Sequence, residues 1–189
     1  MSDDELHLID PSIVGKWIKA EPIHCHQRLE KNQLIEKVRA CSEDGKSLEV
    51  KFRFNPDELE FFFDHAIDHL PGMLEVNGMR QLSLALAHLI YRIPMNYIAL
   101  LGWLKVQFYS YGALRKDTFA NVRLMDHDAL TQFRKVFVFR GIMHQGETKL
   151  MRMDGELIMM HPVLAEKVRL MKISTGDFDR GSVSSAFSW

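Results

Sequence analysis

A long apolar segment in the middle of the chain predicts one buried helix. From Met73 to Ile93 no proline interrupts the sequence, and Leu, Ala, Met and Gln, which favour helices, dominate it. Pro71 suits a first helical turn, because the N–H that proline lacks would have no helical partner there. We therefore expect a helix that begins near residue 71. A helix that is apolar all round is buried within a protein.

Polar side chains within this helix gather on one side. At about 100° per residue, Asn77, Gln81 and His88 project along one narrow stripe, and Arg80 lies at its shoulder. Burying such groups costs on the order of 1–3 kcal/mol each unless each finds a hydrogen-bond partner. The stripe is therefore either a satisfied polar seam between helix and sheet or a surface that faces a substrate.

Alternating apolar and charged residues predict strands before the helix. From Ser47 to Phe54 apolar side chains occupy one face and charged side chains the other, which is typical of a half-buried strand. The preceding Asp44-Gly45 pair is a hairpin turn signal. Between Ile23 and Val38 we expect two further strand-like pieces.

A run of strands is also predicted after the helix. Aromatic and β-branched residues, partly in alternation, mark Ile98 to Tyr111, Phe119 to Met125, Phe133 to Met143 and Lys149 to Met160. The sequence HQGET closes a hairpin between the last two. Because runs of strands that do not alternate with helices favour an antiparallel α+β layer, we expect a sheet wrapped around one long central helix.

Length and composition fit one domain. The chain has 189 residues, of which 47% are hydrophobic and 26% charged, enough for a single sizeable core. We expect a leader over residues 1–20, one domain over residues 21–173, and a Ser- and Gly-rich tail over residues 174–189. The tail is expected to be mobile, or to dock only through Phe187 and Trp189.

Charge and cysteine content argue against several classes of function. Lys and Arg number 24 and Asp and Glu 25, which gives a net charge of −1 and argues against nucleic-acid or membrane-surface binding. The longest apolar run is too short for a membrane span. Cys25 and Cys41 have neither metal-site nor redox spacing, and no secretory signal opens the chain, so we expect a cytoplasmic protein. No motif calls for a cofactor.

The loop before the helix carries the titratable side chains Asp64, His65, Asp68 and His69. Their spacing could gather metal ligands on one turn, as paired histidines do in zinc hydrolases, but we do not expect a metal here. The alternatives are histidines that cap the helix and bridge to the sheet, or histidines that move protons. His24 and His26 are interpreted as a surface or cleft pair.

These residues carry a resemblance to a known family. The loop and helix resemble the hot-dog fold and, within it, the A-factor biosynthesis (AfsA-type) family. The matching positions are Asp64-His65, Asp68-His69, Pro71-Gly72-Met73-Leu74, Arg80-Gln81, Leu86-Ala87-His88 and Ile93-Pro94. The strand pattern extends the similarity more weakly over residues 21–160.

The resemblance implies a fold, an activity and partners. Members of the family are thought to move a β-ketoacyl group from an acyl carrier protein to the hydroxyl of dihydroxyacetone phosphate, in making γ-butyrolactone signals. A typical member has two hot-dog repeats and this chain has one. Because one unit usually completes its acyl tunnel against another, the resemblance implies a homodimer here.

Position 77 departs from the family pattern. Hot-dog dehydratases and many A-factor relatives carry a helix Glu three residues before the Arg, where this chain has Asn77. An amide cannot accept and return a proton at neutral pH as a carboxylate can. The departure argues against dehydration by the usual His and Glu pair, and it leaves acyl transfer or acyl binding open.

A mechanism follows as a hypothesis. A thioester carbonyl at the helix N-terminus would meet the free N–H groups of Gly72 and Met73 and the positive end of the helix dipole. His69, or alternatively His65, would deprotonate an attacking hydroxyl, and Asn77 would orient it.

Substrate contacts are predicted at the remaining polar positions. If the acceptor carries a phosphate, Arg80 is its natural partner because a guanidinium pairs bidentately. Gln81 and His88 are the other substrate-binding residues that we predict on the helix.

The predicted function is acyl transfer. We expect the protein to bind an acyl thioester, carried by an acyl carrier protein or coenzyme A, and to transfer the acyl group to a small hydroxyl acceptor. The alternatives are a thioesterase or dehydratase that uses the loop histidines, and a non-catalytic acyl-binding or scaffold protein.

Overall fold

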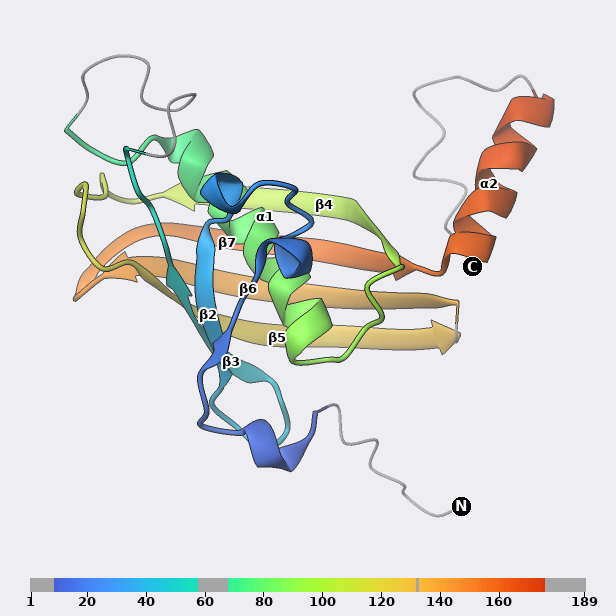
Figure 1. The fold of residues 1–189 in the computed structure, drawn as a ribbon, viewed down its shortest axis with the longest axis horizontal. Helices are drawn as coiled ribbons and strands as arrows, with labels where there is room; N and C mark the ends of the chain where they lie inside the picture. Colours follow the sequence, from blue (N-terminus) through green and yellow to red (C-terminus); the bar gives the residue numbers. More distant parts are fainter. Residues whose placement is uncertain (1–8, 58–67, 132, 176–189) are drawn as a thin grey trace.

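The fold is one antiparallel sheet crossed on one face by a long helix (Figure 1). The computed structural model describes residues 9–57, 68–131 and 133–175. The sheet order is β1-β2-β3-β5-β6-β7-β4. The strands are β1 (Ile18–Lys19), β2 (Ile35–Ala40), β3 (Ser47–Phe52), β4 (Ile98–Phe108), β5 (Phe119–Thr131), β6 (Arg134–Gln145) and β7 (Thr148–Met160). The predicted α+β class, with the sheet around one long helix, is confirmed.

The central helix α1 (Gly72–Leu89) begins where the sequence predicts, with Pro71 as its N-cap. It is buried between residues 74 and 88 on most of its circumference, and each fully buried Leu contributes about 1.5–3 kcal/mol relative to an exposed one. Glycine lets the helix approach the sheet closely. A Cβ at Gly141 of β6 would lie 2.2 Å from the terminal methyl of Met79, so Met79 occupies the space that a larger residue at position 141 would take.

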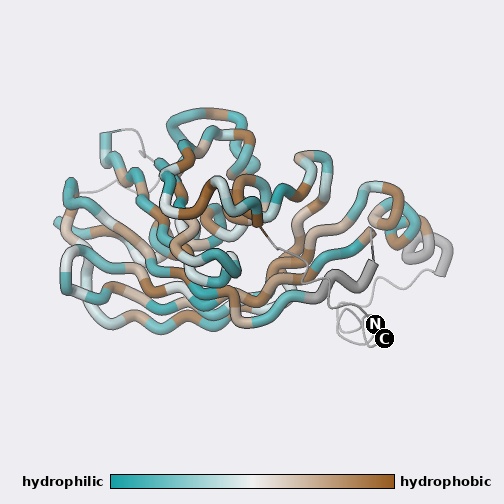
Figure 2. The backbone as a smooth tube through the Cα atoms, turned by 90° about the horizontal axis from the view of Figure 1, so that it is seen from below, coloured by the Kyte–Doolittle hydropathy of each residue, from teal (hydrophilic) through white to brown (hydrophobic). Residues whose placement is uncertain are grey.

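The strand predictions after the helix are confirmed, with differences at the ends. β5 is longer than expected and β4 ends at Phe108. The hairpin between β6 and β7 turns at Gly146, whose φ of 59° is in the left-handed region that favours glycine. Hydropathy alternates along these strands, as expected when one face of a sheet is buried (Figure 2).

The hairpin between β2 and β3 turns at the predicted Asp44-Gly45 pair, with Gly45 at φ 67°. The Asp44 carboxylate accepts a hydrogen bond from the Lys46 N–H at 2.9 Å. The side chain thus holds the turn in the way that Asp favours.

The prediction of two strands between Ile23 and Val38 is wrong in part. Only β2 forms, and the earlier residues make two short 3₁₀ helices, η2 (Pro22–Cys25) and η3 (Glu30–Asn32). Pro22 suits a first helical turn and cannot donate to a strand ladder. The Glu21 N–H also donates to Nδ1 of His24 at 3.0 Å, which turns the chain away from an extended path.

The ends of the described chain show two further features. Within the predicted leader, β1 joins the sheet edge by pairing with β2, and a 3₁₀ turn, η1 (Pro11–Ile13), precedes it. After β7 the sequence analysis missed a helix, α2 (Pro162–Thr175), which projects from the end of the sheet (Figure 1). Pro162 opens it and good helix formers follow. No helix in the described ranges is long and apolar enough to cross a membrane.

Candidate functional site

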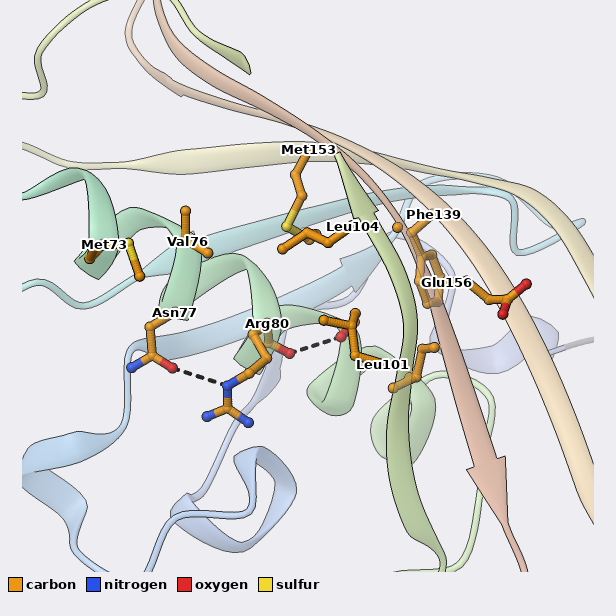
Figure 3. Close-up of a pocket in the computed structure, with 12 residues that line it drawn as sticks. Met73, Val76, Asn77, Arg80, Leu101, Leu104, Phe139, Met153 and Glu156 are labelled. Atoms are coloured by element: carbon orange, nitrogen blue, oxygen red, sulfur yellow. Dashed lines mark hydrogen bonds between the residues drawn. The ribbon is translucent and has the colours of Figure 1, made fainter. Parts of the chain in front are cut away.

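A cavity of about 500 Å³ lies between the first half of α1 and the edge strand β4 (Figure 3). We call it the α1–β4 cavity. Its walls are mostly apolar, which is typical of sites that take apolar ligands. The lining residues are Met73, Val76, Asn77, Arg80 and Ser83 of α1, Leu101 and Leu104 of β4, Phe139 of β6, and Met153, Gly155, Glu156 and Leu157 of β7.

Arg80 and Asn77 form the polar edge of this cavity. Nε of Arg80 donates to Oδ1 of Asn77 at 3.1 Å, and the guanidinium points away from Leu104 and Met153 (Figure 3). Within the described residues no carboxylate forms an ion pair with Arg80. Partial desolvation lowers the pKa of Arg80 from its ordinary value, yet the group stays charged near neutral pH. The cavity edge therefore presents an oriented cation.

A second cavity, of about 460 Å³, lies at the N-terminal end of α1. We call it the His69–Glu75 cavity. It is lined by His69, Leu70, Gly72 and Glu75 and by the aromatic stretch Phe108, Tyr109, Ser110 and Tyr111. None of these lining residues is Lys or Arg. The second cavity thus differs from the first in both polarity and charge.

Glu75 is a feature of this cavity that the sequence analysis missed. Its side chain is 1% exposed, and its Oε1 has no hydrogen-bond partner among the described residues. Burial raises the pKa of Glu75 to about 7, because a low dielectric disfavours the charged form. The available signal was the single acidic residue of a mostly apolar helix.

His69 is positioned by its neighbours on both sides. Its Nδ1 lies 2.9 Å from Oδ1 of Asp68, and its ring centroid lies 4.7 Å from that of Tyr111. The next residue, Leu70, donates its N–H to the Gly112 carbonyl at 2.7 Å. Asp68 can therefore fix the tautomer that leaves Nε2 free as a base. Asp64 and His65 lie outside the described residues.

The N-terminus of α1 separates the two cavities. Gly72 lines the His69–Glu75 cavity and Met73 lines the α1–β4 cavity. Pro71 accepts hydrogen bonds from the N–H groups of Leu74 and Glu75, which leaves the first two N–H groups of the helix available to a ligand. A Cβ at Gly72 would lie 3.2 Å from the Phe108 ring, so glycine permits this close approach.

Gln81 has backbone partners at both ends of its amide. It accepts from the Leu34 N–H at 2.8 Å and donates to the Asn32 carbonyl at 2.8 Å. It is fully buried and lines neither cavity. Its side chain joins α1 to the start of β2.

His88 lies further along the same stripe and also contacts protein. Its Nδ1 lies 2.7 Å from the Ile93 carbonyl oxygen, and its Nε2 lies 3.0 Å from Nε2 of His26. Burial is the main cause that lowers the pKa of both histidines. The structure thus separates the predicted stripe. Asn77 and Arg80 line a cavity, whereas Gln81 and His88 form a seam.

Other reactive side chains are not gathered into a site. The described residues include no group of three or more His, Cys, Asp or Glu side chains placed to hold a metal ion. Cys25 is buried, and burial raises the pKa of its thiol to about 12. A thiol with such a pKa is not a nucleophile at neutral pH.

Comparison with solved structures finds low sequence identity. A crystal structure of an HP0420 homologue from Helicobacter felis is 17% identical, with a TM-score of 0.49, over 75% of this chain and 89% of that one. A probable thioesterase from Bartonella henselae is 12% identical, with a TM-score of 0.45, over 62% and 93%. A putative thioesterase from Silicibacter is 9% identical, with a TM-score of 0.44, over 65% and 77%. No curated protein matches the chain.

Comparison with protein families gives a match over most of the chain. The model of the A-factor biosynthesis hotdog domain matches residues 11–161. This range begins at η1, includes every strand and α1, and ends at the residue before α2. The fold that the sequence resemblance implied is thereby confirmed, and the chain belongs to the A-factor biosynthesis hotdog domain family.

Proposed function

We propose that this protein, an acyl-binding hot-dog protein, transfers an acyl group from a thioester to a small hydroxyl acceptor. The observation that supports the proposal best is the α1–β4 cavity. It is mostly apolar, has a volume of about 500 Å³, and begins at Met73 in the first turn of α1. An acyl chain fits such a cavity chemically, and a carbonyl at its mouth would lie at the helix N-terminus.

The helix N-terminus supplies the electrostatic part of the proposed reaction. The thioester carbonyl oxygen would accept hydrogen bonds from the N–H groups of Gly72 and Met73. Both N–H groups precede the first hydrogen-bonded turn, where the helix dipole also favours negative charge. Such donors stabilise the oxyanion of a tetrahedral intermediate without any side chain.

His69 is the proposed base. With Asp68 on its Nδ1, its Nε2 would take the proton of the acceptor hydroxyl as the new C–O bond forms. The C–S bond then breaks, and the thiolate leaves and receives the proton. We keep His65 as the alternative base, although it lies outside the described residues.

Four residues along α1 have other proposed roles. Arg80 would pair with a phosphate, and Asn77 would hold the guanidinium in position through the 3.1 Å hydrogen bond. Gln81 and His88 would act on the substrate indirectly, by fixing α1 against β2 and η2.

A homodimer through β4 is also proposed. β4 is one of the two edge strands of the sheet, and it carries large apolar residues that are exposed, among them Leu101 at 58% and Trp103 at 44%. A long, exposed apolar edge strand can pair with a strand of another chain. Light scattering after size exclusion should give twice the chain mass, and Leu101→Glu should give the monomer.

Hydrolysis is the second candidate, because the His69 side chain is 39% exposed and water can reach it. A panel of β-ketoacyl and saturated thioesters, with and without dihydroxyacetone phosphate, separates the possibilities. A new ester that requires the phosphate acceptor supports transfer. Thiol release without an acceptor supports hydrolysis instead, and saturable binding without any thiol release would refute both reactions.

A further inference from the structure

The His69–Glu75 cavity contains an acid that the proposed reaction does not use. Glu75 lies two residues before Asn77, and two residues on a helix turn the side chain by about 200°. Glu75 therefore faces the second cavity, whereas Asn77 lines the first. Its function must be sought in the second cavity.

Among the described residues that line the cavity, no Lys or Arg offsets a charge on Glu75. The carboxyl is 1% exposed and its Oε1 has no partner within the described part of the chain. Buried polar atoms in proteins nearly always have a partner, and one without a partner calls for an explanation. The described lining residues that could meet a ligand beside Glu75 are His69, Gly72, Phe108, Tyr109 and Tyr111. A ligand with a positively charged hydrogen-bond donor would provide a partner for Oε1 of Glu75.

The remaining walls indicate what such a ligand carries besides its charge. Phe108, Tyr109 and Tyr111 line the cavity and are 52%, 48% and 80% exposed. Exposed aromatic side chains around a carboxyl are suited to a cation, because the ring face attracts positive charge. They also provide apolar area for the body of the ligand. An anionic ligand beside the Glu75 carboxyl would find no Lys or Arg side chain among the described lining residues.

We propose that the His69–Glu75 cavity binds a small molecule with a primary ammonium group on an apolar body, with the ammonium on Glu75 and the body against Phe108, Tyr109 and Tyr111. This inference goes beyond the proposed function, which assigns no ligand to Glu75. The bound ammonium would lie in the same cavity as His69.

Three probes of similar size test the charge requirement. Calorimetric titration at about pH 8 would compare 2-phenylethylammonium with 2-phenylethanol and with phenylacetate. We expect the ammonium to bind at least about tenfold more tightly than the alcohol, and the carboxylate to bind least. Equal affinity for the ammonium and the alcohol would refute a cation site.

Matched variants assign the effect to one carboxyl. Glu75→Gln keeps the shape and removes the charge, so it should abolish the preference for ammonium. Glu156→Gln changes a carboxylate that lines the α1–β4 cavity. This variant should keep the preference for ammonium. A Glu75→Gln protein that still prefers the ammonium would overturn the proposal.

The pH dependence gives an independent readout. A primary ammonium stays charged at both about pH 8 and about pH 6, whereas Glu75 has a pKa of about 7. Binding should therefore weaken by up to about tenfold at the lower pH. The other titratable groups that line the cavity are His69, Tyr109 and Tyr111, with Asp68 bound to His69. A His69→Gln variant removes the imidazole contribution. Its affinity for the ammonium should still weaken at the lower pH.

This experiment and the thioester assay can fail separately. Binding of a non-hydrolysable acyl thioester analogue, measured on the same preparations, reports on the α1–β4 cavity. Loss of ammonium selectivity with analogue binding intact would refute only the inference drawn from Glu75. Loss of analogue binding with ammonium selectivity intact would refute only the proposed function.

Discussion

The two cavities beside the first turns of α1 differ in charge, although they share one helix. The α1–β4 cavity is mostly apolar, and the cation Arg80 at its edge has no ion-pair partner among the described residues. The His69–Glu75 cavity is rimmed by aromatic side chains and holds a buried acid with an unpartnered oxygen. Neither group has an ion-pair partner among the described residues. Arg80 is exposed and stays solvated, whereas Glu75 is buried, where a charge without a partner is costly. The comparison indicates two ligand groups of opposite charge, one on each side of the helix.

The largest expected effect is a loss of long-chain thioester binding when a larger side chain fills the α1–β4 cavity. Gly155 lines it, and a Cβ at this position would contact Leu104 at 3.3 Å. Gly155→Leu places its side chain where we propose the acyl chain lies, so long-chain thioester binding should weaken by about a hundredfold. A short acyl thioester, measured by the same titration, is the control and should bind nearly as before. Equal losses for both chain lengths would indicate misfolding rather than a filled cavity.

Glu75 should produce the next largest effect, on stability rather than on binding. Its pKa rises from an ordinary 4.5 to about 7 in the folded protein, so the folded state holds the proton more tightly. The stability that this proton provides is complete below about pH 4.5 and is lost as the pH rises through about 7. Glu75→Gln should therefore raise the free energy of unfolding by about 2 kcal/mol near pH 8 and change it little near pH 4.5. Urea titrations at both pH values measure this difference, and an equal change at both would contradict it.

Glu75 also shows where the sequence analysis succeeded and where it did not. The all-round hydrophobicity of residues 73–90 predicted a buried helix, because burial is a property of composition and period. Which cavity each polar side chain faces depends on how the helix is rotated against the sheet. That rotation is set by packing, such as the packing of Met79 against Gly141. The hydrophobic period of the sequence does not predict it.

The seam and the strand errors have a similar origin. Gln81 and His88 lie on the same stripe as Asn77, yet their partners are Leu34, Asn32, Ile93 and His26, which are brought near only by the fold. A strand was expected from Ile23 onward, but Pro22 and the local hydrogen bond from the Glu21 N–H to Nδ1 of His24 favour a 3₁₀ helix there instead. The sequence resemblance identified the family and the fold correctly, because the family pattern extends over residues 11–161 and so over the whole sheet.

Arg80 should produce an effect on one class of ligand only. If it holds a phosphate, Arg80→Ala should lower kcat/KM with a phosphorylated acceptor by about tenfold or more, while binding of the acyl thioester analogue stays nearly unchanged. Arg80→Lys should restore only part of the loss, because lysine cannot pair bidentately. Arg123→Ala, at an exposed position on β5, is the matched control and should behave as the wild type. An equal loss with phosphorylated and non-phosphorylated acceptors would show that Arg80 does not recognise the phosphate.

The smallest expected effect lies at the His26–His88 pair, and it has the opposite pH sign to that of Glu75. The pKa values of both histidines are lowered in the folded protein, chiefly by burial, so the unfolded chain binds protons more readily. Their stabilising contribution is present above the ordinary histidine pKa of about 6.5 and is lost as the pH falls below it. His26 is partly exposed, and the effect should stay below about 1 kcal/mol.

His26→Gln tests this pair against Glu75. A glutamine amide can still donate to Nε2 of His88 but does not titrate, so the variant should lose less stability than the wild type between about pH 6.5 and about pH 5. Combined with Glu75→Gln, it should flatten the stability profile on both the acidic and the alkaline side. Urea unfolding midpoints measured across this pH range test both expectations. A double variant that keeps the wild-type pH profile would show that neither the acid of the second cavity nor the histidine seam controls the stability of α1.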